Sequence, residues 1–421
     1  MSEPRFRAVK GTRDVLPPES ARWEALLARF ATHVERGGYG LLQSPTFEDV
    51  EVFRRVGEGT DVVRKEMYEF EDRSGQRLAL RPEGTASVAR AFVQHRPAIP
   101  WKVWYATPSF RAENVQAGRY RQHHQLGIEC LGTDDPDADV EVIGLLWDFY
   151  KDLGLRRLTL LLNSMGDGVC RPAYLDLLRG YLLERRSALC DEHRDRVADH
   201  PLRVLDCRRA ACRAATADAP RLVDHLCPEC KAHFESVQVG LGALEIPFII
   251  ETRLVRGLDY YTRTTFEVQA DALAAAQNGL GGGGRYDGLV ESMGAPPTPG
   301  IGFGTGIERI LLTCDGEGVF PVEPKSVSVW VVDVTSSGAA RDLTAELRRA
   351  GISADRAFDH KSMRAQMKKA NSSGARLALI VGDQEWADGT VTVRDLRAEG
   401  DAQEAVGRGD VVDHVRKVLG P

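Results

Sequence analysis

The hydrophobic pattern of residues 101–131 predicts two antiparallel strands joined by a polar loop at residues 114–118. On the returning strand, Leu126, Ile128 and Cys130 are apolar at every second position, which predicts one face packed against a core. The opposite face of the two strands gathers Ser109, Arg111, Glu113, Arg119, Arg121, His123, Gln125 and Glu129, with Gly127 as a gap among them. A solvent-exposed sheet face has the same alternation, but arginines followed by acceptors favour the floor of a site for a zwitterion and a phosphate.

Four regions of the chain differ in pattern, and they predict its domains. Residues 1–167 mix helical stretches with strand pairs, and residues 168–230 are rich in Leu, Arg, Ala and Asp with helical periodicity. Residues 231–322 return to strands and glycines, whereas residues 326–421 alternate strand and helix. We therefore expect a helical insertion that interrupts one larger domain, followed by a small C-terminal α/β domain.

The segment RGLDYYTRTTFEV places a charged residue at the entrance to a strand. The run from Thr264 to Val268 is β-branched and aromatic and predicts the strand, and Arg256 precedes it beside Gly257. Arg256 is either a solvated loop charge or a group directed at an anion, and one arginine does not decide between the two.

The segment GIGFGTGIERI, residues 300–310, predicts a strand that runs into a helix with Arg309 one turn inside it. It does not fit the dinucleotide spacing G-x-G-x-x-G, and the chain has no P-loop sequence. Its glycines either let a phosphate or base approach the backbone or allow close packing of helix and strand. The segment GGGGRYDGLV has the composition of a turn.

Composition narrows the possible functions. A chain of 421 residues with 43% hydrophobic and 28% charged residues is expected to form two or three globular domains. Its net charge of −6 means that any nucleic-acid contact depends on local basic surface. It has no apolar run of about 18 residues and no signal-peptide pattern at the start, and its eight cysteines then favour a reducing cytoplasm.

Seven segments resemble the histidyl-tRNA synthetase family of bacterial type, within the class II aminoacyl-tRNA synthetases. They are KGTRDVLPPE (10–19), LALRPEGT (78–85), the hairpin above, LVRGLDYYTRTTFEV (254–268) with GGGRYDGL (282–289), GIGFGTGIERI, and KSMRAQMKKANSSGARLALIVGDQE (361–385). The resemblance implies an α+β fold: an antiparallel sheet flanked by helices, an inserted helical domain and a C-terminal α/β anticodon-binding domain.

The same resemblance implies an activity. It would be the ATP-dependent activation of L-histidine to histidyl-adenylate, then transfer to the 3′ end of tRNA(His), with release of AMP and pyrophosphate. ATP would enter with Mg²⁺. A homodimer is also implied, because the family's first class II motif, here residues 39–53, lies at the subunit interface.

Resemblance also assigns roles in the site. Arg111 would bind the α-phosphate, Glu113 the adenine amino group, and Arg309 the nucleotide from the opposite side. Arg256 would reach the histidine carboxylate and the α-phosphate together and act with Arg111 as a catalytic group, by electrostatic stabilisation. His123 stands where the family usually has a phenylalanine stacked on adenine.

Histidine itself would be bound by a second set of residues. Glu83 and Thr85 would hold the ammonium group, and Gln125 would lie near the carboxylate. An imidazole needs both a donor and an acceptor, which Glu129 and Tyr261 can supply, with Tyr260 beside them. None of these residues is a protein ligand to a metal.

Contacts with tRNA are expected in two places. Asn114 and Val115 replace an Arg-Pro pair common in the family's acceptor-end loop, but Gln116 and Arg119 remain. Further along the chain, the side chains of Lys361, Arg364 and Lys368 are spaced to form a basic stripe on one helix face. A solvated helix face has the same spacing.

The insertion carries a cysteine pattern, C-x4-C-x14-C-x2-C, that fits two explanations. Its members are Cys207, Cys212, Cys227 and Cys230, which form either a tetrahedral zinc site or part of a small packed core. His225 and His233 are competing ligands, and the family does not require a metal here.

Two other functions are considered. One is the regulatory subunit of ATP phosphoribosyltransferase, a relative that senses histidine without catalysis; retention of Arg111, Arg256, Arg309 and the C-terminal domain argues against it. The other is a class II synthetase for a different amino acid, which Glu129 and Tyr261 disfavour.

Overall fold

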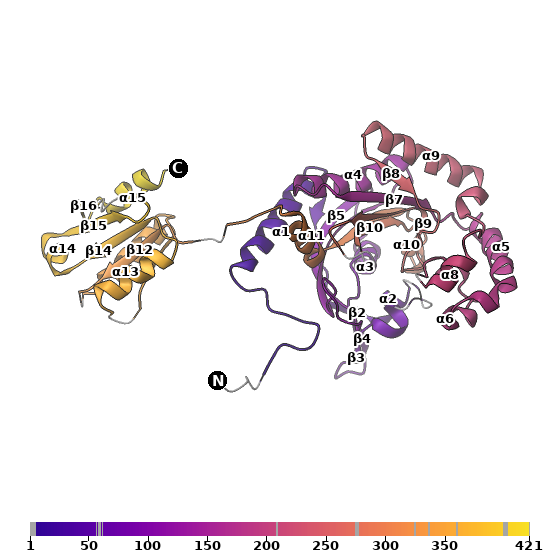
Figure 1. The fold of residues 1–421 in the computed structure, drawn as a ribbon, viewed down its shortest axis with the longest axis horizontal. Helices are drawn as coiled ribbons and strands as arrows, with labels where there is room; N and C mark the ends of the chain where they lie inside the picture. The colour runs from indigo at the N-terminus through magenta and orange to yellow at the C-terminus, as the bar shows by residue number, and fades with distance from the viewer. Residues whose placement is uncertain are drawn as a thin grey trace. The chain divides into compact units, whose positions relative to one another are not determined.

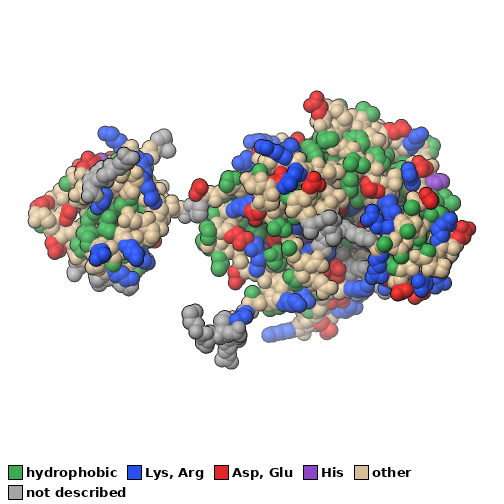
Figure 2. Space-filling view, viewed as in Figure 1, with side chains coloured by type: hydrophobic (Ala, Val, Ile, Leu, Met, Phe, Trp, Pro, Cys, Tyr) green, Lys and Arg blue, Asp and Glu red, His purple; other side chains and the backbone are tan. Residues whose placement is uncertain are grey.

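The fold is given by a computed structural model that describes residues 6–420 except 56, 58–59, 61, 208, 274–277, 324–325, 336, 359–360 and 399–402. The chain divides into two compact units, Met1–Val322 and Glu323–Pro421 (Figure 1). No helix among the described residues is long and apolar enough to cross a membrane. Acidic and basic side chains are interspersed over the visible face of each unit (Figure 2), in keeping with the small net charge.

An eight-stranded sheet forms the centre of the first unit. Its strands lie in the order β1 (Gly40–Leu41), β5 (Trp101–Phe110), β6 (Gln122–Leu131), β11 (Gly300–Gly306), β10 (Gly279–Arg285), β9 (Thr262–Ala270), β7 (Leu158–Ser164) and β8 (Phe248–Ile250). The six inner strands of this order, from β5 through β6, β11, β10 and β9 to β7, pair antiparallel. The two outermost pairs, β1 with β5 and β8 with β7, are parallel. The mixed helices and strands and the antiparallel-rich sheet confirm the predicted α+β class.

Four long helices cover one face of this sheet and form the main core with it. They are α1 (Glu19–Glu35), α4 (Pro136–Asp152), α9 (Pro228–Ala243) and α11 (Ile307–Glu317). Figure 1 shows α4 and α9 running along this side. Leu126, Ile128 and Cys130 of β6 are at most 1% exposed in that core, which confirms the face expected from the alternation.

The opposite face carries smaller elements. Helices α3 (Thr85–His95) and α10 (Leu289–Ser292) pack on it around the buried Tyr105 and Tyr286. Beside them lie α2 (Val50–Arg54), the π-helical turn η1 (Val62–Glu66) and a three-stranded sheet of β2 (Phe47–Asp49), β4 (Arg77–Leu80) and β3 (Glu69–Glu71). The buried Arg81 donates to the carbonyl oxygens of Pro45 and Pro108 and so joins the small sheet to the end of β5.

A helical region separates β7 from β8. It contains α5 (Arg171–Glu184), η2 (Arg186–Ala188), α6 (Asp191–Arg194), α7 (Pro201–Leu205), α8 (Ala210–Ala215), η3 (Leu222–His225) and the start of α9. This region has its own small hydrophobic cluster, which includes Tyr174, Leu178, Leu182, Val204 and Leu222. The remaining length of α9 packs in the main core of the unit.

The second unit alternates strands and helices, as its sequence pattern predicts. Its five-stranded sheet has the order β13 (Ala354–Arg356), β12 (Val329–Asp333), β14 (Leu377–Val381), β15 (Thr390–Asp395) and β16 (Gln403–Gly407). Its helices are α12 (Ala339–Arg349), α13 (Met363–Ser372), α14 (Asp383–Asp388) and α15 (Val411–Leu419). Hydrophobic clusters lie on both faces of this sheet.

Candidate active site

A cavity of about 560 Å³ opens in the first unit where the predicted segments meet. Its walls come from the loop after β5, from β6, β9, β10 and β11, from the first turn of α11, from the segment before β9 and from the end of α7. The residues that line it are Arg111, Glu113, Gly118, Arg119, Tyr120, His123, Gln125, Asp206, Arg256, Glu267, Gly279, Leu280, Gly281, Gly282, Gly304, Gly306, Glu308 and Arg309. Segments more than 100 residues apart in sequence therefore form one polar cavity.

Arg256 points into this cavity rather than into solvent, since its side chain is 20% exposed. Its Nη1 lies 3.1 Å from Oε2 of Glu267 on β9, and its guanidinium carbon lies 5.7 Å from the centre of the Tyr261 ring. Burial lowers the pKa of Arg256, but the nearby Tyr261 and Glu267 hold it above its ordinary value. A Cβ atom at Gly282 would lie 2.9 Å from Nη1, so glycine is needed there for the arginine to occupy this position.

Three buried polar atoms of cavity-lining residues have no hydrogen-bond partner within the described part of the chain. They are Nε of Arg256, Nδ1 of His123 and Oε1 of Gln125. Buried polar groups are nearly always satisfied, and leaving one unpaired costs about 1–3 kcal/mol. Three such atoms around one cavity indicate a site that is completed by a polar ligand.

Glu129 lies fully buried on β6 and accepts hydrogen bonds from three hydroxyl groups. The donors are Thr85 at 2.7 Å, Tyr105 at 3.2 Å and Tyr286 at 2.5 Å. Burial raises the pKa of Glu129 to about 8, and the three hydroxyls only partly oppose this shift. The carboxyl group can therefore hold a proton near neutral pH, when no ligand is bound.

Glu83 and Thr85, which are expected to bind the substrate ammonium, both make hydrogen bonds within the protein. The carboxylate of Glu83 accepts from the backbone N–H groups of Thr85 and Ala86, at 2.7 and 2.8 Å, and so caps the start of α3. Burial raises the pKa of Glu83. The hydroxyl of Thr85 donates to Glu129. The Glu83 carboxylate and the Thr85 hydroxyl can still accept further hydrogen bonds, since a carboxylate has about four acceptor positions and a hydroxyl has two.

Tyr260 and Tyr261 adjoin the buried carboxylates. Their ring centres are 4.6 Å apart, and the Tyr260 ring lies edge-on to Tyr286 at 5.8 Å. Tyr261 is 8% exposed, and burial raises its pKa. Together with Glu129 these rings supply aromatic surface, a hydroxyl and a carboxyl group to the same region, which suits an aromatic ligand that has both a donor and an acceptor.

Arginines gather at the other end of the cavity. Nε of Arg111 donates to the carbonyl oxygen of Pro82 at 3.0 Å, and Nε of Arg309 donates to that of Gly279 at 2.8 Å. Glu113 forms an ion pair of 3.2 Å with Arg119. Burial, reinforced by the positive charge of Arg111, lowers the pKa of His123 to about 3, so its imidazole is neutral. Cationic groups around a neutral ring suit a nucleotide.

The glycines of β11 have a role that neither sequence interpretation anticipated. A Cβ atom at Gly302 would lie 1.8 Å from Oε2 of Glu129, and one at Gly304 would lie 2.2 Å from Nε2 of Gln125. These glycines make room for the side chains of the neighbouring strand β6 rather than for helix packing. As expected, β11 runs directly into α11 with Arg309 in its first turn.

Several expected positions need correction. β5 ends at Phe110, so Arg111 and Glu113 follow the strand, and β6 begins at Gln122, so Arg119 and Arg121 precede it. Gln116 and Arg119 instead pair with each other across the turn of the loop, where both are exposed. The backbone N–H of Arg111 still donates to the carbonyl oxygen of Arg121 at 2.8 Å, so the pairing of the two segments extends just beyond the strand ends before the loop turns.

The basic stripe in the second unit is shorter than expected. Helix α13 begins at Met363, so Lys361 lies before the helix and only Arg364 and Lys368 stand on it. All three side chains are exposed.

The cysteine pattern does not form one site, so the hypothesis of a single zinc site with these four cysteines is wrong. Cys207 and Cys212 lie with Cys190 and His193, whereas Cys227 and Cys230 lie with Asp167 and Cys170. His233 joins neither group and contacts Asp139 at 3.2 Å, and His225 lies beside the ring of Tyr174.

Sequence reasoning missed three residues of the site: Glu267, Tyr105 and Tyr286. Glu267 and Tyr286 stood in the quoted segments TTFEV and GGGRYDGL, but nothing in the sequence indicated their partners. Tyr105 gave no signal, because its alternation on β5 is that of any strand residue.

Comparison with known proteins gives one consistent family. A family model described as histidyl-tRNA synthetase matches residues 11–169 and 194–310, and one described as an anticodon binding domain matches residues 319–418. The chain is 47% identical to a histidine–tRNA ligase of Moorella thermoacetica, over 97% of each chain. It is 45% identical to one from Rhodococcus jostii, over 99% of this chain and 98% of the relative. An apo histidyl-tRNA synthetase structure from S. aureus matches with a TM-score of 0.83 and 32% identity, over 98% of this chain and 100% of that chain.

Proposed function

The chain belongs to the histidyl-tRNA synthetase family, and we propose that it is a ligase that joins L-histidine to tRNA(His) at the expense of ATP. The observation that carries this proposal is one cavity that combines Arg111, Arg256 and Arg309 with unpaired polar atoms. That cavity adjoins a region of buried carboxyl and phenol groups around Glu129. The first set fits a nucleotide and the second an imidazole.

Activation is a displacement at phosphorus. An oxygen of the histidine carboxylate attacks the α-phosphorus of ATP, the bond to the β-phosphate oxygen breaks, and pyrophosphate leaves with the electron pair. Negative charge grows on the α-phosphate oxygens, where Arg111 and Arg256 would act as fixed countercharges. Arg256 can contact carboxylate and phosphate together, because its guanidinium is a planar fork that stays protonated. Arg309 would bind the nucleotide from α11.

Magnesium would enter this site with ATP. Mg²⁺ prefers carboxylate and phosphate oxygens. The carboxylates on the cavity walls already have partners, Glu267 with Arg256, Glu113 with Arg119 and Glu308 with His124, so the nucleotide phosphates would supply most of the ligands and Glu113 or Glu308 at most a remaining acceptor position. When bound, the ion supplies charge neutralisation on the nucleotide phosphates. The residues present fit that requirement.

Selection of histidine would rest on the buried region. An imidazole N–H would donate to Glu129, and the other ring nitrogen would pair with Tyr261 beside Tyr260. Gln125 would contact the carboxylate, and Glu83 with Thr85 the ammonium group. A site that satisfies its buried polar groups only with the correct ligand rejects an analogue that lacks them by a large factor, on the order of 10⁴.

Transfer of histidine to tRNA would involve both units. Gln116 and Arg119 lie exposed in the loop beside the cavity and are proposed contacts for the acceptor end. Arg364 and Lys368 on α13, with Lys361 before it, are proposed contacts in the anticodon-binding domain. We place the activity in the cytoplasm, where tRNA is used in translation.

We also propose a homodimer formed through residues 39–53. The rings of Phe47 and Phe70 lie 6.0 Å apart and are 51% and 41% exposed, and Leu41 on the edge strand β1 is 53% exposed. Apolar side chains exposed next to an edge strand suit burial by a second subunit. Sedimentation that gave a monomer of 46.4 kDa at micromolar concentration would refute this proposal.

The direct test is amino-acid-dependent exchange of labelled pyrophosphate into ATP, with each amino acid in turn. We expect exchange with histidine alone, and esterification of tRNA(His) when tRNA is added. Exchange with a different amino acid would favour another class II synthetase, and no exchange at all would favour a histidine sensor without catalysis.

A further inference from the structure

The segment between α5 and α9 has little regular structure to hold it together. Its pieces η2, α6, α7 and α8 contain only 3, 4, 5 and 6 residues. Isolated helices of this length are not stable in water. A lobe of about 40 residues rarely buries enough apolar surface to fold alone and usually needs a disulfide or a metal.

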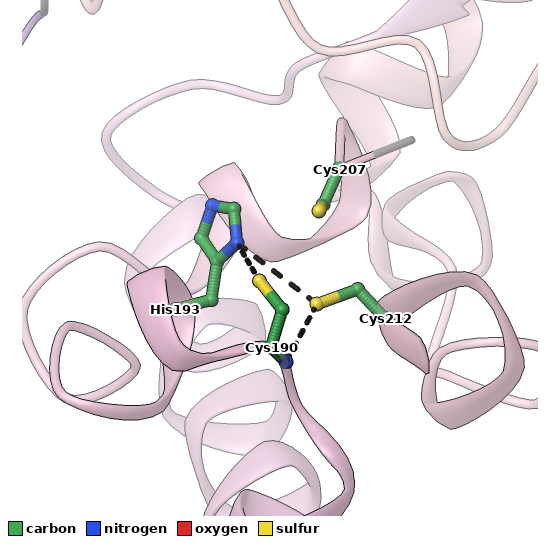
Figure 3. Close-up of side chains that lie close together, drawn as sticks. All are labelled: Cys190, His193, Cys207 and Cys212. Atoms are coloured by element: carbon green, nitrogen blue, oxygen red, sulfur yellow. Dashed lines mark hydrogen bonds between the residues drawn. The ribbon is translucent and has the colours of Figure 1, made fainter. Parts of the chain in front are cut away.

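Four potential metal ligands converge where these pieces meet (Figure 3). One ligand atom from each of Cys190, His193, Cys207 and Cys212 lies within 4.8 Å of all the others. Nδ1 of His193 lies 3.1 Å from Sγ of Cys190 and 3.9 Å from Sγ of Cys212. Tetrahedral zinc with Zn–S distances of about 2.3 Å and Zn–N distances of about 2.0 Å needs its ligand atoms roughly 3.5–4 Å apart, so small side-chain adjustments would complete such a site.

We propose that these four residues bind one structural zinc ion in a Cys₃His site. Their spacing, C-x2-H-x13-C-x4-C, supplies two short pairs separated by a longer loop, which is the usual arrangement of structural zinc ligands. On binding, each of the three cysteines loses its thiol proton, and the neutral imidazole ligates through Nδ1. The site closes with four protein ligands, so it leaves no open position for catalysis.

The surroundings of the four ligands match those of a metal site. The backbone N–H of Cys190 points at Sγ of Cys212 at 3.3 Å, and such N–H donors stabilise thiolate ligands. Arg209, which lies between Cys207 and Cys212 in the sequence, has its side chain next to Cys190. There its positive charge can offset the net negative charge of three thiolates on one Zn²⁺. Cys212 is fully buried within the hydrophobic cluster of the lobe.

The role of this zinc is to join the parts of the lobe. Cys190 directly precedes α6, His193 lies within it, Cys207 follows α7, and Cys212 lies within α8. One ion would therefore fix three short helices to one another. Cys190 and His193 also lie outside the ranges matched by the family model, so the site is not a requirement of the family reaction.

Metal content tests the proposal directly. The full chain, expressed with zinc and desalted, is expected to retain zinc, and Cys190→Ser or His193→Gln is expected to lower the content by one equivalent per chain. The group of Asp167, Cys170, Cys227 and Cys230 stays intact in both variants, so any zinc bound there remains. His225→Gln is the matched control, because His225 is an exposed histidine of the same region outside both groups, and it should keep the content of the parent. A parent chain without zinc, or a Cys190→Ser variant with the content of the parent, would overturn the proposal.

A second measurement separates loss of a ligand from loss of folding. Cobalt(II) exchanged into the parent should give the strong visible bands of a tetrahedral site and the ultraviolet charge transfer of cobalt–thiolate bonds. His193→Cys offers a fourth thiolate, so it should keep the metal content of the parent. Measured as the difference from the Cys190→Ser variant, in which the second group is unchanged, its charge-transfer intensity should be about a third greater than that of the parent. Cobalt spectra of octahedral type, or an unchanged intensity in His193→Cys, would contradict the ligand set.

Discussion

Nη1 of Arg256 lies 3.1 Å from Oε2 of Glu267, while Nε of the same guanidinium is buried without a partner in the described chain. One side of the guanidinium group is thus held by the protein, and the other is available to a ligand. A residue that is half held in this way is already oriented when substrate arrives, and this lowers the entropic cost of reaching the transition state.

Arg256→His tests whether this arginine stabilises the transition state. We expect adenylate formation to slow by about 100-fold or more, since one electrostatic donor is typically worth about 3 kcal/mol of the barrier. Affinities for histidine and ATP should change much less, and transfer from preformed adenylate to tRNA should be nearly unaffected. Single-turnover measurements of the two steps separate these outcomes.

Arg253 provides the control for that experiment. Its guanidinium donates to the carbonyl oxygen of Leu205 and does not line the cavity, so Arg253→His should retain activation. If Arg256→His slowed activation and transfer equally, or only raised the KM for histidine, Arg256 would be a binding residue.

Glu267→Gln tests whether Glu267 orients the guanidinium group of Arg256. A charge-assisted hydrogen bond is worth about 1.5–3 kcal/mol. Without the carboxylate charge the Arg256 side chain should occupy several conformations, and activation should slow about tenfold. The double variant Glu267→Gln, Arg256→His should be no slower than Arg256→His alone, because Glu267 acts through the arginine. Additive losses in this double-mutant cycle would mean that Glu267 acts on the substrate or its metal instead.

Gly127→Ala tests whether the absence of a side chain at this position of β6 is needed to seat the ring of Tyr105. The new Cβ would lie 2.3 Å from Cζ of Tyr105, so the buried ring must move away from Glu129. We expect a destabilisation of about 1–3 kcal/mol together with weaker histidine binding. Gly180→Ala within α5 is the control: nothing lies within 4 Å of that position, and the helix should gain up to about 1 kcal/mol. Equal stability of the two variants in urea unfolding would contradict the assignment.

The sequence was sufficient to predict features that depend on neighbouring residues of one strand or helix. Alternation identified Leu126, Ile128 and Cys130 as core residues, and the strand-to-helix sequence around Arg309 identified β11 and α11. Both depend on neighbouring residues along one element, whose periodicity is fixed by backbone geometry.

The sequence was insufficient where partners come from different elements. Arg256 meets Glu267 only because the chain turns back between them, and Glu129 meets Tyr105 and Tyr286 through strand register. The cysteines were grouped wrongly for the same reason: spacing shows which residues can pair, but the packing of very short helices decides which ones do.

His123→Phe tests the proposal that the ring of His123 stacks on adenine, a position where the resemblance implies phenylalanine. A phenyl ring offers more stacking surface, and because Nδ1 of His123 has no partner in the described chain, its removal breaks no hydrogen bond within the protein. The larger stacking surface then has to outweigh only the hydrogen bond that Nδ1 would make to the ligand. Stacking on a base is worth about 1–3 kcal/mol, so a modest gain in area should lower the KM for ATP about threefold. His123→Leu, which cannot stack, should raise it. Since burial and then Arg111 lower the pKa of His123 to about 3, the pH profile of activation between pH 6 and 9 should be the same in all three proteins.

Glu129→Gln tests the protonation of the buried carboxyl group through stability. Burial raises the pKa of Glu129 from 4.5 to about 8, so between these values the folded chain binds a proton that the unfolded chain does not. The contribution of this group to stability is therefore fully present below about pH 4 and is lost as the pH rises through 8. Glutamine does not titrate, so the free energy of unfolding of the variant, relative to that of the parent, should increase by roughly 1–4 kcal/mol from pH 5 to pH 9. Urea unfolding of both proteins at several pH values measures this difference, in which all other titrating groups cancel. Parallel stability curves would mean that Glu129 is ionised in the folded chain throughout, held so by its three hydroxyl donors.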